Sequence, residues 1–113
     1  MYKIYGIPNC DTVKKSLNWL KAHNIPYEFH DYKKEGITKE KLEEWLRQYP
    51  WDEVLNRKST TWKELTEEEK PKDANTAIQL MMQKTSVIKR PIVESQRKIM
   101  AIGFNEDNFK KLS

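Results

Sequence analysis

The sequence predicts an α/β fold in the order β-α-β, a block of helices, then β-β-α. Short alternating runs rich in β-branched and aromatic residues lie near both ends of the chain, which is typical of strands. The stretch between them places its apolar residues at helical spacing. With 113 residues, 37% of them hydrophobic, we expect a single domain, residues 1–113, with a helical insertion at about residues 36–85.

The first third of the chain predicts a β-α-β unit. Residues 2–5 and 26–32 alternate as strands, and the stretch between them has the apolar stripe of a helix that ends near residues 23–24. That stripe consists of Val13, Leu17 and Leu20. Two strands joined by a helix in about thirty residues are expected to pair in parallel.

The middle of the chain predicts several helices. Thr38 can cap the first of them, and Pro50 is expected to end it. Thr61 and Thr66 each precede a glutamate by three positions, which is typical of a capping box. Asp73 or Asn75 is expected to open a further helix. Its apolar side is predicted to contain Ala77, Ile78, Met81 and Met82.

The last quarter predicts a hairpin and a closing helix. Residues 92–94 and 98–102 alternate as strands around a polar turn, so we expect them to pair antiparallel. Gly103 ends the second strand, and Asn105 can cap a short helix that packs through Phe109 and Leu112.

Cys10 is the candidate nucleophile, because it lies where the first strand gives way to the first helix. The unpaired amides and the positive dipole end of a helix N-terminus favour a thiolate over a thiol. A free cysteine can also be an inert, buried apolar residue. The polar neighbours Asn9, Asp11 and Thr12 and the turn residue Pro8 favour an exposed loop instead.

Composition excludes several function classes. A single cysteine allows no intramolecular disulfide and no zinc site built from cysteine pairs, so we expect no metal. No stretch approaches the length of a membrane span, and no leader pattern precedes the first strand. The net charge of +4 is spread among acidic residues, which argues against nucleic-acid binding. We expect a cytoplasmic monomer.

Two arginines and two histidines are the candidate partners of Cys10. Arg57 and Arg90 lie at loop positions, where planar guanidinium donors can bind a carboxylate or an oxyanion, although each can equally be a surface residue. His23 falls at the far end of the first helix, about 20 Å from Cys10 at ~1.5 Å per residue. His30 lies on the second strand, and neither histidine is assigned a catalytic role.

Four segments resemble the arsenate reductase (ArsC)/Spx family of thioredoxin-fold proteins, especially its YffB-like branch. They are Tyr5-Gly6-Ile7-Pro8-Asn9-Cys10, Leu55-Asn56-Arg57, Lys89-Arg90-Pro91-Ile92 and Ile102-Gly103-Phe104-Asn105. The resemblance implies a thioredoxin-like fold with an inserted helical subdomain and a cis peptide before Pro91 that faces Cys10. It also implies that Cys10 is the redox nucleophile. The implied substrate- or anion-binding residues are Arg57, Arg90, Pro91, Asn9, Asp11 and Thr12.

The chain departs from parts of this family. Members that reduce arsenate tend to have His-Asn-Pro before the cysteine, where this chain has Gly6-Ile7-Pro8, and a late third arginine near the position of Gly103. Arsenate is therefore not the expected substrate. Spx-type redox sensors use a Cys-x-x-Cys pair, and Val13 in the second cysteine position excludes such a switch.

The resemblance implies a monothiol, glutathione-dependent thiol reductase with no bound cofactor. Glutathione or another small thiol would be its co-substrate, and a glutaredoxin-like protein could regenerate it. The alternative is an Spx-like, non-catalytic module that binds other proteins through its surface.

Overall fold

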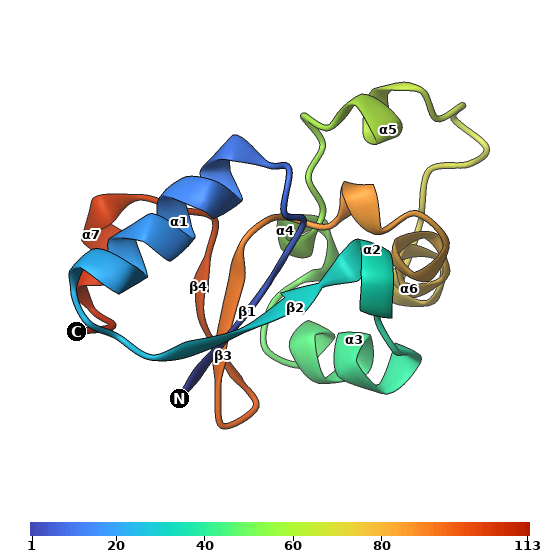
Figure 1. Ribbon diagram of the computed structural model, residues 1–113. Helices are drawn as coiled ribbons and strands as arrows, with labels where there is room; N and C mark the ends of the chain where they lie inside the picture. Colours follow the sequence, from blue (N-terminus) through green and yellow to red (C-terminus); the bar gives the residue numbers. More distant parts are fainter. The chain divides into compact units, whose positions relative to one another are not determined.

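The computed structural model describes all 113 residues and separates them into two compact units. The first unit combines Met1–Glu35 with Arg90–Ser113, and the second is the continuous segment Gly36–Lys89. Figure 1 labels their helices and strands. The single domain of residues 1–113 and its insertion at about 36–85 stay predictions.

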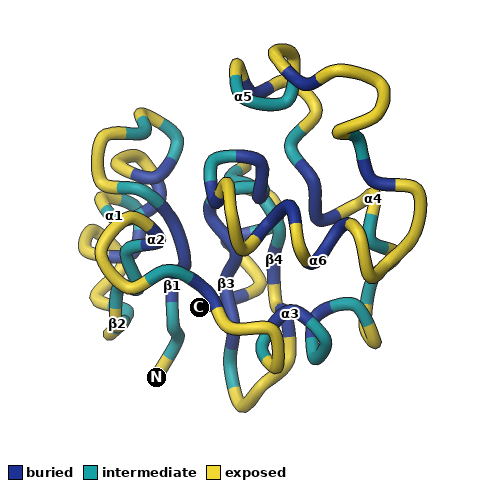
Figure 2. The backbone as a smooth tube through the Cα atoms, turned by 90° about the vertical axis from the view of Figure 1, so that its right-hand side faces the viewer, coloured by how far each residue is buried: buried dark blue, intermediate teal, exposed yellow.

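The first unit contains a four-stranded mixed sheet in the order β2-β1-β3-β4. Its strands are β1 (Tyr2–Gly6), β2 (Tyr27–Asp31), β3 (Ile92–Ser95) and β4 (Lys98–Ile102). β1 pairs in parallel with β2, while β1 with β3 and β3 with β4 are antiparallel. The predicted β-α-β unit and the C-terminal hairpin are both confirmed. Central β3 is buried over its first three residues (Figure 2).

Three helices belong to this unit: α1 (Asp11–Ala22), α2 (Tyr32–Glu35) and α7 (Glu106–Lys110). Leu20 of α1 and Phe109 of α7 pack with residues of three strands in one apolar cluster, and Figure 1 shows these two helices side by side. The buried members of that cluster are Ile4, Leu20, Val93, Ala101, Phe109 and Leu112. Asn105 caps α7 as predicted, by accepting a hydrogen bond from the Asn108 amide at 2.7 Å.

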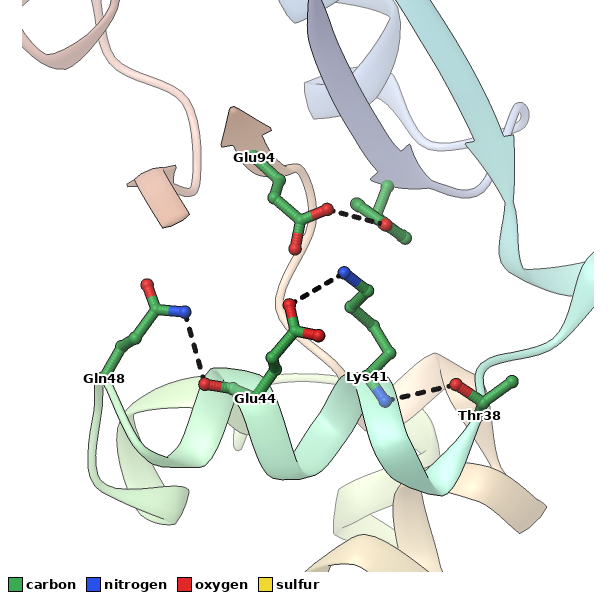
Figure 3. Close-up of polar contacts among 6 residues, drawn as sticks. Thr38, Lys41, Glu44, Gln48 and Glu94 are labelled. Atoms are coloured by element: carbon green, nitrogen blue, oxygen red, sulfur yellow. Dashed lines mark hydrogen bonds and ion pairs between the residues drawn. The ribbon is translucent and has the colours of Figure 1, made fainter. Parts of the chain in front are cut away.

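The second unit consists of short helices. They are α3 (Lys39–Leu46), α4 (Trp51–Val54), α5 (Thr60–Lys63), α6 (Ala74–Gln83) and the 3₁₀ helix η1 (Thr85–Val87). Thr38 caps α3 through the Lys41 amide at 3.1 Å (Figure 3). Asp73 caps α6 with a reciprocal capping box, so the first of the two predicted openings is the observed one.

Three details of this unit differ from the sequence prediction. Ser59, not Thr61, caps α5, because the Ser59 hydroxyl lies 3.1 Å from the Trp62 amide. Thr66 and Glu69 form both hydrogen bonds of a capping box, but they close a turn and no helix follows. Met82 is 44% exposed and lies outside the apolar side of α6, whereas Met81 is fully buried.

The third helix also ends earlier than the proline that was expected to stop it. α3 ends at Leu46, and the amide of Gln48 turns back to the Trp45 carbonyl at 2.9 Å, which tightens the last turn. Pro50 instead precedes α4 as its N-cap residue. None of the helices combines the length and the apolar character that crossing a bilayer requires.

Candidate active site

Cys10 is the N-cap residue of α1, as the sequence predicts. Its amide donates to the Ile7 carbonyl at 3.2 Å, which closes the turn after β1, and its carbonyl accepts the first helical hydrogen bond from Lys14 at 3.0 Å. The side chain is half-buried, and this is the only cysteine of the chain. Its sulfur therefore lies at the positive end of a twelve-residue helix and remains accessible.

Gly6 sets how closely the first turn of α1 approaches β1. A Cβ atom at Gly6 would lie 2.8 Å from one methyl of Val13 and 3.3 Å from the other, so a larger residue would push that turn away. Val13 is fully buried here and its own amide faces the Cys10 sulfur. The absence of a side chain at Gly6 thus supports the geometry of the cysteine.

The sheet brings Arg90 and Pro91 to the same place. β1 and β3 are antiparallel, with Tyr5 opposite Ile92, so the segment after β1 and the segment before β3 meet at one end of the sheet. The Arg90-Pro91 peptide is cis, which confirms this expectation. The Pro91 carbonyl accepts a hydrogen bond from the Gly103 amide at 2.8 Å, which ties this segment to the end of β4.

The surroundings of Cys10 lower its pKa overall. Partial burial alone would raise the pKa, because it penalises the charged sulfur. Three neighbours favour the thiolate and together outweigh burial. They are the Val13 amide, the Arg90 side chain through a hydrogen bond and its charge, and the Thr12 amide. The Cys10 side chain makes no N-cap hydrogen bond, so the amides of Val13 and Thr12 act mainly through their dipoles, which point at the sulfur. The site therefore favours a nucleophilic sulfur.

Polar groups that the sequence analysis missed are buried in the same unit. The Tyr5 hydroxyl donates to Glu94 Oε1 at 2.9 Å, and the Glu94 side chain is 5% exposed (Figure 3). The Tyr5 ring lies 6.2 Å from that of Tyr32, whose buried hydroxyl has no hydrogen-bond partner. Burial raises the pKa of Tyr32, so its hydroxyl stays protonated, and the Arg90 charge acts in the opposite direction. The members of this cluster are far apart in sequence, so predicting it would have required the register of β1 against β3.

The other predicted site residues differ in their placement. Asn9 and Asp11 are exposed beside Cys10, and the amide of half-buried Thr12 faces the sulfur. Arg57 belongs to the second unit, where its Nη2 lies 3.2 Å from Asp52 Oδ2. The convergence of Arg57 and Arg90 on one anion remains a prediction.

The two histidines lie in surroundings that explain them without catalysis. His23 stacks on Trp19 with ring centroids 3.8 Å apart, and its Nδ1 lies 2.8 Å from the Trp19 carbonyl at the far end of α1. His30 lies against the Tyr5 ring at 4.7 Å and its Nδ1 is 3.7 Å from a Glu35 carboxylate oxygen. No group of three or more His, Cys, Asp or Glu residues is arranged to hold a metal ion.

Comparison with known proteins agrees with this architecture. The ArsC family model matches residues 5–112, nearly the whole chain. The chain belongs to the ArsC family. The solved structure of the YffB (PA3664) protein is 42% identical, with a TM-score of 0.91 over 98% of this chain and 97% of that one. This confirms the resemblance and the thioredoxin-like fold.

Two further relatives show the range of the ArsC family. A solution structure titled as an arsenate reductase (ArsC) related protein from Brucella melitensis is 43% identical, with a TM-score of 0.79, and covers 97% of this chain and 92% of that one. The regulatory protein MgsR of Bacillus subtilis is 32% identical over 96% of this chain and 87% of its own length. The names of these two relatives thus refer to arsenate reductase in one case and to regulation in the other.

Proposed function

We propose that this ArsC-family protein is a monothiol reductase that uses Cys10 and glutathione. The observation that carries the proposal is the Arg90 side chain, which hydrogen-bonds to the Cys10 sulfur at a helix N-terminus and lowers the pKa of that sulfur. A lowered thiol pKa raises the thiolate fraction, and the thiolate is the form that attacks disulfides. A reducing compartment such as the cytoplasm would keep this sulfur free between turnovers.

The chemistry needs only one protein sulfur. The Cys10 thiolate attacks the glutathione sulfur of a mixed disulfide, forms a Cys10–glutathione disulfide and releases the substrate as a thiolate, which takes up a proton. A second glutathione thiolate then attacks the glutathione sulfur of this intermediate, restores the Cys10 thiolate and leaves oxidised glutathione. In total, the mixed disulfide and one free glutathione become a free substrate thiol and oxidised glutathione, and no second cysteine is required.

The residues around Cys10 support each part of this cycle. Arg90 and the amides of Thr12 and Val13 stabilise the negative sulfur both before attack and when it leaves. An additional arginine at the site would help to hold the carboxylates of glutathione, and Arg57 is our candidate for that role. Gly103, whose amide donates to the Pro91 carbonyl, presents no side chain near the position where the family resemblance places the third arginine of arsenate-reducing members. We therefore expect arsenate reduction to be weak or absent.

The test is adduct formation followed by turnover. Incubation with oxidised glutathione should add a single glutathione to the chain, and reduced glutathione should remove it. Cys10→Ser is the matched control, because it differs by one atom and should form no adduct. An absence of adduct on the wild-type chain, or a stable adduct that glutathione cannot remove, would overturn the proposal.

A second candidate function is regulation through protein binding, which the similarity to MgsR favours. In that case Cys10 would be modified without turnover. Adduct formation that is reversible but supports no reduction of an added mixed disulfide would favour this alternative over catalysis.

A further inference from the structure

A hollow of about 360 Å³ is lined entirely by residues of the second unit. Its lining comes from one stretch of 22 residues that includes α4 and α5. The lining residues are Trp51, Arg57, Trp62, Glu67, Lys70, Pro71 and Lys72. The volume lies at the lower end of the range for small-molecule sites, about 300–1,000 Å³, so it suits one ring system with a small substituent.

One side of the hollow is aromatic. Trp51 and Trp62 are both half-buried, and Pro71 beside them is buried, so flat apolar surface is held in place while it remains accessible. Lys70 Nζ lies 5.8 Å from the centroid of the Trp62 ring, a distance at which cation and ring attract each other. Indole faces of this kind stack on planar ligands with little regard to their identity.

The other lining groups are mainly cationic. Arg57, Lys70 and Lys72 line the hollow together with a single carboxylate, Glu67. Glu67 Oε1 lies 3.0 Å from Lys70 Nζ, and this hydrogen bond lowers the pKa of Glu67 and keeps it ionised. Asp52 engages Arg57 through one oxygen at 3.2 Å, which leaves further donors of the five on the guanidinium. Three cations against two carboxylates leave a positive excess beside the tryptophans.

The backbone of Lys72 is tied to the start of α6. Its amide donates to Thr76 Oγ1 at 2.9 Å, and the same hydroxyl takes part in the capping box of α6. The cap thus fixes the point at which the Lys72 side chain leaves the chain.

We infer that this hollow binds a small planar organic anion, whose ring stacks on Trp51 and Trp62 and whose carboxylate or phosphate contacts Arg57 and Lys72. Neither half of the site suffices alone. An uncharged ring would leave the cations unused, and a bare anion would make no use of the tryptophan faces. Arg57 is shared with the proposed glutathione site, whereas Trp51, Trp62 and Lys72 are not, so variants at Trp62 and Lys72 test this inference separately from the proposed function of Cys10.

A titration followed by nuclear magnetic resonance tests the inference on the intact chain. The four tryptophans give four indole N–H signals, and two of them, from Trp19 and Trp45, serve as internal controls. Adenosine 5′-monophosphate and 2-naphthoate should shift the signals of Trp51 and Trp62 selectively. They should bind at least about tenfold more tightly than adenosine, which lacks the anionic group, or inorganic phosphate, which lacks the ring. A phosphate preference would identify a nucleotide-like source of the anion, and a naphthoate preference an aromatic acid.

Variants locate the binding site. Trp62→Leu should weaken both planar anions about tenfold, and Lys72→Gln about two- to fivefold. Lys39→Gln is the matched control, because it removes an exposed lysine of the same unit outside the hollow and should change nothing. If Trp62→Leu lowers the thermal midpoint strongly, Trp51→Leu replaces it. Equal binding of phosphate alone, equal binding of adenosine, shifts confined to Trp19 or Trp45, or no shift at all would each overturn the inference. Alkylation of Cys10, measured on the same samples, reports separately on the proposed thiol chemistry.

Discussion

The two units of this chain obtain their order in different ways. In the first unit, hydrogen bonds join residues far apart in sequence, such as Tyr5 with Glu94, 89 positions away, and Tyr2 with Leu112, 110 positions away. In the second unit, side-chain caps join residues three positions apart at three helix starts, those of α3, α5 and α6. The comparison teaches that the cysteine site draws its residues from distant parts of the chain, whereas the hollow is lined by one continuous stretch of 22 residues.

The largest expected effect is the loss of stability when one large buried side chain is removed from either unit. Phe109→Ala should lower the free energy of unfolding by about 3–5 kcal/mol, and Met81→Ala by about 2–5 kcal/mol, because both side chains are fully buried. Phe109 packs in the cluster that also holds Leu20 of α1, so only its variant should also disturb Cys10. Chemical denaturation gives the stabilities, and the pH midpoint of alkylation gives the thiol pKa. A Met81→Ala variant that shifts this midpoint as much as Phe109→Ala would break the comparison.

Gly6→Ala should act on the site itself. The new methyl would lie 2.8 Å from Val13, and the resulting repacking should cost about 1–3 kcal/mol and raise the pKa of Cys10 as the first turn of α1 moves. Gly36→Ala is the control. Gly36 belongs to the second unit and has open space around it, so an added methyl there costs stability only through its backbone angle, φ +65°. Alkylation rates against pH should shift only for Gly6→Ala. An unchanged rate profile would show that the close approach to Val13 is unimportant for the thiol.

A smaller loss of stability is expected when the N-cap side chain of one helix in either unit is removed. Asn105→Ala removes the cap of α7 and Thr38→Ala that of α3, and each should cost about 0.5–2 kcal/mol. Hydrogen exchange of amides should show the loss in the helix concerned: in α7 for one variant and in α3 for the other. Equal loosening of both helices by either variant would contradict the description of two separately ordered units.

The smallest effect is on stability as a function of pH. The folded chain lowers the pKa of Cys10 below its unfolded value of about 8.5. The thiolate therefore contributes stability that is fully present above the unfolded pKa and is lost as the pH falls through the folded pKa. The stability difference between wild type and Cys10→Ser should be larger near about pH 9.5 than near about pH 5. A difference that is independent of pH would contradict the lowered pKa.

The sequence was sufficient for most of the first unit. Alternation and capping residues predicted its four strands, the N-cap position of Cys10 and the Asn105 cap, because these depend on neighbours within a few residues. The turn between β3 and β4 was also predicted, and the structure places Gln96 and Arg97 there with positive φ. The buried carboxylate of Glu94 was missed, because its burial depends on the register of β1 against β3.

The second unit shows why the remaining features could not be predicted. Ser59, Thr60 and Thr61 are three successive hydroxyl residues, and only the backbone path decides that Ser59 makes the cap. No periodicity in the sequence reveals that Trp51 and Trp62 share a hollow with Arg57. The Asp52 partner of Arg57 was likewise not foreseen.

The central claim is that Arg90 and the helix N-terminus together lower the pKa of Cys10, and the pH dependence of its alkylation tests this claim most directly. The wild-type midpoint should lie below the free-cysteine value of about 8.5. Arg90→Gln should raise it, because the variant removes both a hydrogen bond and a charge from the sulfur. The midpoint of Arg97→Gln, an exposed arginine in the hairpin turn, should remain that of the wild type. A wild-type midpoint at or above about 8.5, or no change in Arg90→Gln, would contradict the account.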